Sequence, residues 1–231
     1  MQHPHNHSTT AILLFAYSEE KESAIKCIAT KDERNRLLWQ KMNKRVITTI
    51  QKTKLPYFTF SEQNQIGTTF GERLSNAIQT IIDKGFEKVI VIGNDCLTLQ
   101  VKNLCEAEQK LQSNDLVIGP DFNGGIYLLG VTKLSFDFTK LTSIIWQTAN
   151  VFDDLQKLFT EKKIAFLPKM NDCNTSIDFR VAANRLSFLD DLIGFIYSIL
   201  EKAISIHQYE TFFPFLYSSE IECNKGSPCL I

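Results

Sequence analysis

Long apolar runs are missing from this sequence. None approaches the roughly 18 consecutive apolar residues that a membrane-spanning helix requires, and no basic, apolar leader of the secretory type follows the first ten residues. The six cysteines include no Cys-x-x-Cys pair, so we expect free thiols in a reducing compartment, with a local Cys223–Cys229 disulfide left open. The formal net charge of −1 gives no electrostatic footprint for nucleic acid. These absences favour a cytoplasmic protein without a membrane span or a nucleic-acid partner.

The composition is that of an ordinary globular chain. Of the 231 residues, 44% are apolar and 22% are charged. A chain of this length buries roughly 70% of its unfolded surface, so folding needs neither a disulfide nor a metal. We expect one domain over residues 11–207, a flexible polar arm over 1–10 and an aromatic-rich appendage over 208–231. The arm carries His3, His5 and His7, for which a metal site is the alternative.

Apolar patterning alternates between strand-like and helix-like segments. Short apolar runs predict strands over residues 11–16, 57–60, 89–92, 115–120, 125–131 and 164–168. Helical periodicity predicts helices over residues 32–52, 69–85, 101–112, 143–163 and 188–206, with a further helix beginning near Thr175. Because strands that alternate with helices imply right-handed crossovers, the predicted fold is α/β with a mostly parallel central sheet flanked by helices.

The strand predicted over residues 89–92 ends in Gly93, Asn94 and Asp95. In open α/β sheets, ligands bind outside the carboxyl ends of the strands, and Gly93 allows the backbone to come close to a ligand. A carboxylate at this place suits a hard cation such as Mg²⁺ or Mn²⁺, which in turn neutralises a diphosphate. The alternative is that Asn94 and Asp95 form a turn or cap the next helix.

A glycine pair, Gly124 and Gly125, interrupts the connection between two predicted strands. The pair is consistent with a simple hairpin turn. It is equally consistent with main chain that approaches a bound sugar or phosphate. Asp121 and Asn123 lie on the same side of this segment if its backbone is extended, because side chains repeat every two residues.

Four stretches together resemble one protein family. They are QIGTTFGERLSNAI (residues 65–78), GNDCLTL (93–99), GPDFNGGIYLLGV (119–131) and NDCNTSIDF (171–179). In this order and spacing they resemble the bacterial family called domain of unknown function 2064. The resemblance implies the three-layer, Rossmann-like GT-A fold of nucleotide-diphospho-sugar transferases, which is related to the nucleotidyltransferases of molybdopterin and coenzyme synthesis.

The resemblance also implies roles for individual residues. Asp95 falls at the position expected to hold a metal–diphosphate. Arg73 belongs to a helix-opening motif that would face an anion, and its alternative is a solvated surface arginine. Asp172 or Asp178 would act as a base or orient the acceptor, although Asp178 is also placed to cap a helix. The remaining substrate-binding candidates are Lys26, Gln65, Gly67, Asn94, Asp121, Asn123, Gly124 and Gly125.

The sequence departs from the family patterns at several charged positions. The usual Pro-Gly opening is replaced by FAYSEEKESAIKCIAT (residues 15–30), in which three glutamates would repel a diphosphate. Lys26 alone matches a basic position of that opening. Asn123 and Asn174 stand where the family has aspartate, and each change weakens a divalent-cation site. These departures indicate altered or lost chemistry.

Three functions remain open on these grounds. The first is transfer of a sugar from a nucleotide-diphospho-sugar donor to an unknown acceptor, with Mg²⁺ or Mn²⁺ at Asp95 stabilising the departing diphosphate. The second is a catalytically degenerate binding or scaffold protein that uses the aromatic appendage as an interaction surface, and a homo-oligomer is kept open with it. The third is nucleotidyl transfer, ranked last because a basic, glycine-rich opening loop for a triphosphate is missing.

Overall fold

The computed structural model describes residues 9–186 and 190–200. The expected appendage over 208–231, almost all of the expected arm over 1–10, and both Cys223 and Cys229 therefore lie outside the described residues. Of the helix predicted over 188–206, residues 191–200 are helical, residue 190 is not, and residues 188, 189 and 201–206 lie outside the described residues. Within the described part of the chain, no helix combines the length and the apolar character that a bilayer crossing requires.

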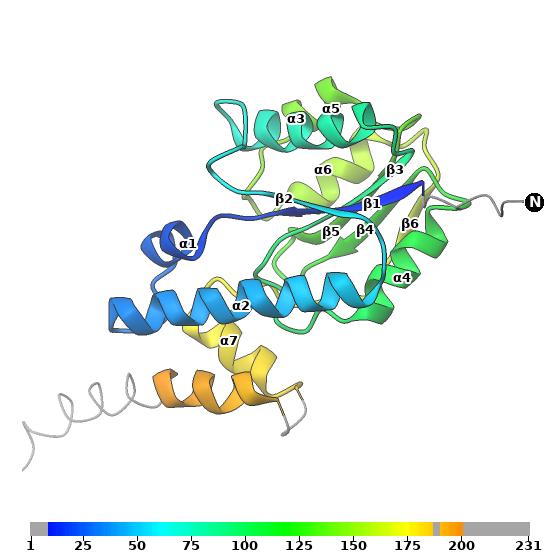
Figure 1. The fold of residues 1–231 in the computed structure, drawn as a ribbon. Coiled ribbons are helices and arrows are strands. Elements are labelled where there is room, and N and C mark those ends of the chain that lie inside the picture. Colours follow the sequence, from blue (N-terminus) through cyan, green and yellow to red (C-terminus); the bar gives the residue numbers. More distant parts are fainter. Residues whose placement is uncertain (1–8, 187–189, 201–231) are drawn as a thin grey trace, which may run out of the picture.

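A six-stranded sheet forms the middle layer of the molecule (Figure 1). Its spatial order is β2-β1-β3-β5-β4-β6. β5 runs antiparallel to both of its neighbours, and the other three pairings are parallel, so the mostly parallel sheet predicted from the sequence is confirmed. The strands are β1 (Thr10–Phe15), β2 (Tyr57–Phe60), β3 (Lys88–Ile92), β4 (Leu116–Pro120), β5 (Ile126–Thr132) and β6 (Ile164–Phe166).

Helices cover both faces of this sheet, which gives the three layers predicted from the sequence. α3, α5 and α6 lie on one face, α2 and α4 lie on the other, and α7 packs beyond α2 with the helical residues 191–200 (Figure 1). The helices are α1 (Glu19–Ile25), α2 (Asp32–Lys52), α3 (Phe70–Asp83), α4 (Val101–Lys110), α5 (Phe138–Ser143), α6 (Val151–Leu158) and α7 (Ser176–Ala183).

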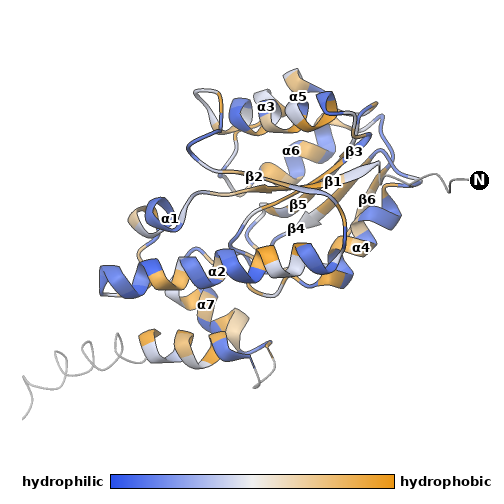
Figure 2. Cartoon of the chain, viewed as in Figure 1, coloured by the Kyte–Doolittle hydropathy of each residue, from blue (hydrophilic) through white to orange (hydrophobic). Residues whose placement is uncertain are grey.

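The apolar runs of the strands feed two cores, one on each face of the sheet. Neighbouring residues of β1 separate between them, since Leu13 belongs to the cluster under α3 and Ile12 to the cluster under α2 and α4. Because both faces are covered, β1 and β4 are buried at every position and read as continuous apolar runs. Figure 2 shows the same arrangement, with the apolar faces of the helices turned toward the sheet.

Local signals in the sequence set the ends of several helices correctly. The Thr69 hydroxyl accepts from the amide of Glu72, whose carboxylate accepts from the amide of Thr69, which is the predicted capping box of α3. Gly85 follows that helix with φ +96°, as expected for a left-handed terminus. Thr175 and Asp178 form the predicted cap of α7.

The helix predicted over residues 143–163 is confirmed only over Val151–Leu158 and is wrong for residues 144–150 before them. The chain leaves α5 at Ser143 and enters α6 only at Val151, and the residues between them are not helical. Tertiary contacts replace the missing turns: the indole of Trp146 donates to the carbonyl of Leu141 at 2.8 Å, and its ring packs against Phe70. The apolar periodicity is real, but these contacts outweigh the helical preference of the segment.

A second difference is α1, which was not predicted from the sequence. The Ser18 hydroxyl caps the first turn of α1 by accepting from the amide of Lys21. The backbone N–H and the hydroxyl of Ser18 both donate to the carboxylate of Glu62. Glu22 and Lys26 lie one turn apart and form an ion pair at 3.8 Å. That i, i+4 spacing of opposite charges is the signal in the sequence that favoured a helix here.

Candidate functional site

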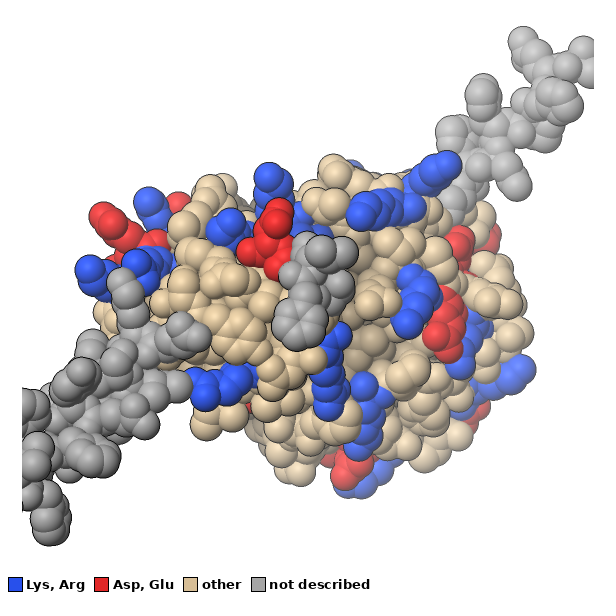
Figure 3. Space-filling view, turned by 90° about the horizontal axis from the view of Figure 1, so that it is seen from below, with Lys and Arg blue, Asp and Glu red and all other residues tan. Residues whose placement is uncertain are grey.

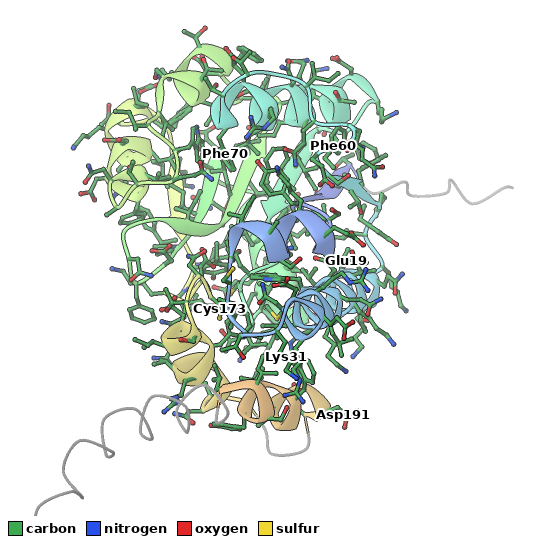
Figure 4. All side chains as sticks on the ribbon, turned by 90° about the vertical axis from the view of Figure 1, so that its left-hand side faces the viewer. Glu19, Lys31, Phe60, Phe70, Cys173 and Asp191 are labelled. Carbon is green, nitrogen blue, oxygen red and sulfur yellow. The ribbon has the colours of Figure 1, made fainter. Side chains whose placement is uncertain are left out.

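A cavity of about 640 Å³ opens at the carboxyl ends of β1 and β3. Its lining comes from the ends of β1 and β3, helix α1 with Lys26, Gln65 and the start of α3, the β4–β5 turn with β5, residues 146–151, and residues 172–174. Figure 4 views the molecule from this side, with α1 in front, Phe70 above it and Cys173 below it. The cavity therefore lies where the ligands of open α/β sheets bind.

The end of β3 places Asp95 at the cavity with its side chain 23% exposed. A Cβ atom at Gly93 would lie 2.9 Å from Oδ1 of Asp95, so glycine leaves room for the carboxylate to lie over its own backbone. The carbonyl of Asp95 accepts from the amide of Cys173 at 2.9 Å. This bond ties β3 to residues 171–174 and brings Asp172 beside Asp95.

An ammonium group neutralises Asp95. Lys26 Nζ donates to Oδ2 of Asp95 at 2.8 Å, lies 3.8 Å from Glu22 and stands over the ring of Trp39. Burial lowers the pKa of Lys26, but attraction to Asp95 and Glu22 outweighs it, so the pKa of Lys26 is raised and the group stays charged. Burial and repulsion from Asp95 raise the pKa of Glu22, against the attraction of Lys26.

Asp172 is the most perturbed acid of the cavity. It is buried, and its Oδ1 has no hydrogen-bond partner among the described residues. Burial, followed by repulsion from Asp95 and Asp121, raises the pKa of Asp172 well above its usual value, and Lys26 opposes this. The cavity thus holds four carboxyl groups, on Glu22 and these three aspartates, around one ammonium group.

The β4–β5 turn is held by Asp121. Its Oδ1 accepts from the amides of Asn123 and Gly125, both at 2.7 Å. A Cβ atom at Gly125 would lie 2.5 Å from Oδ2 of Asp121, and one at Gly124 would lie 2.0 Å from the carbonyl oxygen of Ala149. The glycine pair therefore makes a tight turn, and Gly125 also lines the cavity. The turn interpretation of the pair is confirmed, and the approach of its main chain to a bound sugar or phosphate stays a prediction.

A polar group lies at the β2 side of the cavity. Gln65 donates through Nε2 to the carbonyl of Phe60 at 3.1 Å, and its buried Oε1 has no partner among the described residues. Arg73 donates to the carbonyl of Thr68 and, at 3.2 Å, to the hydroxyl of Tyr17. Gln65 and Tyr17 line the cavity, whereas Arg73 supports Tyr17 from outside.

Aromatic rings form an apolar wall of the same cavity. The ring centroids of Phe15 and Phe70 are 5.5 Å apart, and those of Phe70 and Trp146 are 5.4 Å apart. All three residues line the cavity. Such a wall suits the planar face of a base or the apolar face of a sugar ring.

The cavity brings together eight of the twelve residues proposed from the sequence. They are Lys26, Gln65, Asn94, Asp95, Asp121, Asn123, Gly125 and Asp172. Asn94 is buried and donates to the side chain of Asn43 at 2.8 Å, so it holds β3 against α2.

The other four proposed residues, Gly67, Arg73, Gly124 and Asp178, do not line it. Gly67 makes the turn before α3, with φ +134°. Asp178 accepts from the amide and hydroxyl of Thr175 through Oδ2, which is the capping role left open by the sequence.

Several lining residues were missed from the sequence. Of the three glutamates expected to repel a diphosphate, only Glu22 lines the cavity, and it is paired with Lys26. Trp146 and Gln147 were hidden inside a segment predicted to be helical. Tyr17 and Phe70 lie within two of the stretches compared with the family, residues 15–30 and 65–78, but nothing in the sequence indicated that they face a ligand.

The residues fit a cation that arrives with a diphosphate better than a preformed metal cage. Among residues 9–186 and 190–200, no three His, Cys, Asp or Glu side chains converge on a metal-binding position. Mg²⁺ is commonly held by one or two carboxylates, with substrate phosphates and water as the other ligands. Asp95, with three further carboxyl groups lining the same cavity, is compatible with an arrangement of this kind.

The charges elsewhere are less concentrated. On the face of α2 and α7, seen from below in Figure 3, Lys and Arg side chains are spread out with Asp and Glu among them. The grouping of four carboxyl groups at one ammonium is therefore a feature of the cavity and not of that face.

Comparisons with known proteins agree with this architecture. The model of a family described as "Uncharacterized protein conserved in bacteria (DUF2064)" matches residues 21–148, more than half of the chain. A search of curated proteins found no match. Among solved structures, a "putative nucleotide-diphospho-sugar transferase" from Desulfovibrio desulfuricans G20 is 23% identical at a TM-score of 0.74 and covers 87% of this chain and 98% of its own. The predicted fold is confirmed by this similarity.

Two further solved structures are more distant. Rv0371c of Mycobacterium tuberculosis H37Rv, in complex with manganese, is 8% identical at a TM-score of 0.41, over 77% of this chain and 99% of its own. A cytidylyltransferase from Leptospira borgpetersenii is 13% identical at a TM-score of 0.39, over 90% and 100%. At these scores neither structure supports an argument about this chain.

Proposed function

The chain belongs to the bacterial family DUF2064, and we propose that it binds a nucleotide-diphospho-sugar in the cavity at the carboxyl ends of β1 and β3 and transfers the sugar to an acceptor. The observation that carries this proposal is the buried, unpartnered Oδ1 of Asp172 beside Asp95, in a cavity with more carboxyl groups than cations. An unsatisfied buried acceptor is costly, so it is expected to gain a partner when a ligand binds.

The diphosphate is assigned to the acidic end of the cavity. Asp95 would hold a Mg²⁺ or Mn²⁺ ion there, and that cation would lower the negative charge that develops on the departing diphosphate. Lys26 carries three N–H donors and uses one on Asp95, so it has donors left for phosphate oxygens. Attraction to Lys26 and a cation replaces the repulsion expected from the opening glutamates.

We assign the two unpartnered oxygens to two parts of the reaction: Oε1 of Gln65 to the nucleobase of the donor, and Oδ1 of Asp172 to the acceptor. Oε1 of Gln65 is available to accept an N–H of the nucleobase beside the aromatic wall. Oδ1 of Asp172 is available to accept the hydroxyl of the acceptor, and a raised pKa suits a carboxylate that takes a proton near neutral pH. Asp178 is proposed only as the cap of α7, and Asp121 only as the support of the β4–β5 turn.

Titration calorimetry tests donor binding. The panel is UDP-glucose, GDP-mannose, ADP-glucose and dTDP-glucose, each with and without Mn²⁺. We expect one donor to bind more tightly with Mn²⁺, and Asp95→Asn to remove that difference. Asp153→Asn, which removes an exposed carboxylate outside the cavity, is the matched control. If no donor binds at millimolar concentration, the proposal fails.

A transfer assay with the donor that binds then tests the role of Asp172. Asp172→Asn is expected to bind the donor but to transfer sugar at least about 100-fold more slowly, the lower range for loss of a general base. Equal rates for the variant and the wild type would remove Asp172 from the chemistry.

A second candidate function is donor binding without transfer. The Lys26–Asp95 ion pair favours it, because an ammonium already occupies the oxygen that a cation would use. In that case the protein would bind a donor with the same affinity with and without Mn²⁺, and it would transfer no sugar to any acceptor tested.

Nucleotidyl transfer remains the weakest candidate. Only residues 16–18 connect β1 to α1, this connection holds no glycine, and Ser18 is bonded to Glu62. A short connection of this kind lacks the free amides of a phosphate-cradling loop. Release of pyrophosphate from a nucleoside triphosphate would contradict this ranking.

A further inference from the structure

We propose that Gln147 selects the donor by hydrogen bonding to the hydroxyl groups of its sugar. This inference rests on the proposed function and adds a specificity-determining residue to it. Gln147 lies in residues 144–150, which were expected to be helical. In the structure this segment is not helical, and its residues 146–149 line the cavity.

The backbone at Gln147 is strained. Its φ is +64°, a left-handed conformation that a residue with a Cβ atom rarely adopts. Among the described residues other than glycine, only Lys54 shares a positive φ. Strain of this kind persists only where the surrounding structure enforces it, and it collects at binding sites.

Packing on both sides of Gln147 enforces the conformation. On one side, Trp146 lies over Gly71, where a Cβ atom would come within 3.0 Å of the indole. On the other side, the carbonyl of Ala149 lies against Gly124, whose own carbonyl accepts from the amide of Phe152 at 3.0 Å. Both contacts depend on a glycine, so the sequence of α3 and of the β4–β5 turn provides the surface on which the segment sits.

The side chain of Gln147 gains nothing from this arrangement within the protein itself. It is exposed and lines the cavity. Its carboxamide has no hydrogen-bond partner in the part of the chain that the structure describes. The packing of Trp146 and Ala149 therefore holds the strained backbone, and it presents to the cavity a carboxamide that is free to meet a ligand.

The position of Gln147 indicates which part of the donor it meets. Gln65 follows β2, whereas the contacts of Ala149 place the segment on the β5 side. In the order β2-β1-β3-β5, the end of β3 with Asp95 lies between them. A diphosphate at Asp95 therefore directs the nucleoside toward Gln65 and the sugar toward Gln147. A carboxamide both donates and accepts, which matches the hydroxyl groups of a sugar.

The test compares each nucleotide-sugar with the nucleoside diphosphate that lacks the sugar. Four pairs are titrated against wild type, Gln147→Gly and Gln147→Asn: UDP-glucose and UDP, GDP-mannose and GDP, ADP-glucose and ADP, and dTDP-glucose and dTDP. For the pair that binds, Gln147→Gly is expected to weaken the nucleotide-sugar about tenfold and to leave the nucleoside diphosphate unchanged, because one hydrogen-bonding group is lost. Gln147→Asn keeps a carboxamide and tolerates a positive φ, so a smaller loss is expected.

Thermal unfolding supplies an independent readout. Gln147→Gly is expected to raise Tm by about 2 °C, since glycine relieves the strain without removing an internal contact. Lys54→Gly is the matched control: Lys54 has φ +62°, is exposed and lies outside the cavity. It should gain stability in the same way and bind every ligand as the wild type does.

Three results would overturn the inference. Equal weakening of the nucleotide-sugar and the nucleoside diphosphate would mean that Gln147 does not read the sugar. Unchanged binding of both would mean that Gln147 does not contact the donor at all, and a fall in Tm would show that the conformation is not strained. If the wild type binds none of the eight ligands, the proposed function itself fails, and this inference fails with it.

Discussion

The ammonium nitrogen of Lys26 lies 2.8 Å from Oδ2 of Asp95, and this pair joins the helix after β1 to the end of β3. Both side chains are largely buried, with exposed fractions of 19% and 23%. Because water screens such a pair only partly, each partner depends on the other for neutralisation. The same pair keeps a charged donor at the place assigned to the diphosphate.

Removal of the ammonium should therefore destabilise the protein more than loss of a surface ion pair. Lys26→Met leaves Asp95 and Glu22 unpaired, and we expect the free energy of unfolding to fall by about 2 kcal/mol, after allowance for partial exposure. Urea unfolding measures this loss. The double variant Lys26→Met, Asp95→Asn should recover more than half of it. Additive losses in this cycle would mean that the two residues do not interact.

The buried carboxyl group of Asp172 predicts how stability changes with pH. Its pKa is raised above the unfolded value of about 3.9, so the folded state holds this proton more tightly than the unfolded state does. Its contribution is thus most favourable at low pH and is lost as pH rises through the raised pKa. Asp172→Asn lacks this loss and should be more stable than wild type at pH 8, by about 2–4 °C in Tm for each 1 kcal/mol.

Thermal unfolding from pH 4 to pH 8, with a chelator present throughout, checks this prediction for Asp172. The difference between variant and wild type should grow with pH up to the raised pKa and stay constant above it. A difference that does not vary with pH would contradict the prediction.

Two glycines with positive φ separate backbone strain from steric conflict. Gly124 has φ +87° and lies against Ala149, whereas Gly85 has φ +96° with no atom within 4 Å of an added Cβ. Gly85→Ala should cost about 1–2 kcal/mol through its backbone alone. Gly124→Ala should cost about 1–3 kcal/mol more, because it also displaces residues 144–150. Equal losses in urea unfolding would show that the Ala149 contact is unimportant.

The described cysteines should differ sharply in reactivity. Burial, chiefly, raises the pKa of the Cys173 thiol to about 12 and that of the Cys96 thiol well above its usual value. Cys27 and Cys105 are exposed. At pH 8, in native protein, a maleimide should label Cys27 and Cys105 within minutes and the two buried thiols only after denaturation. Peptide mapping by mass spectrometry identifies the labelled sites, and early labelling of Cys173 would contradict the structure.

Some features of this protein follow from its sequence alone. Continuous apolar runs such as β1 can be stable only when buried on both faces, and capping boxes such as Thr69–Glu72 are local, so the α/β order and several helix ends could be predicted. The position of Asp95 could be predicted for the same reason. The residues that directly follow a buried strand lie at the edge of the sheet, where the cavity opens.

Tertiary structure decided what these local rules cannot reach. Asp172 becomes a buried, unpartnered acid only because the amide of Cys173 bonds to the end of β3, far earlier in the chain. Trp146 and Gln147 are not helical because Trp146 packs on Gly71 of α3 and Ala149 packs on Gly124 of the β4–β5 turn. Lys26 meets Asp95 through a helix that was not predicted from the sequence. Periodicity and capping depend on the local conformational preference of a segment. The burial, charge and strain of a side chain depend instead on which distant segments surround it.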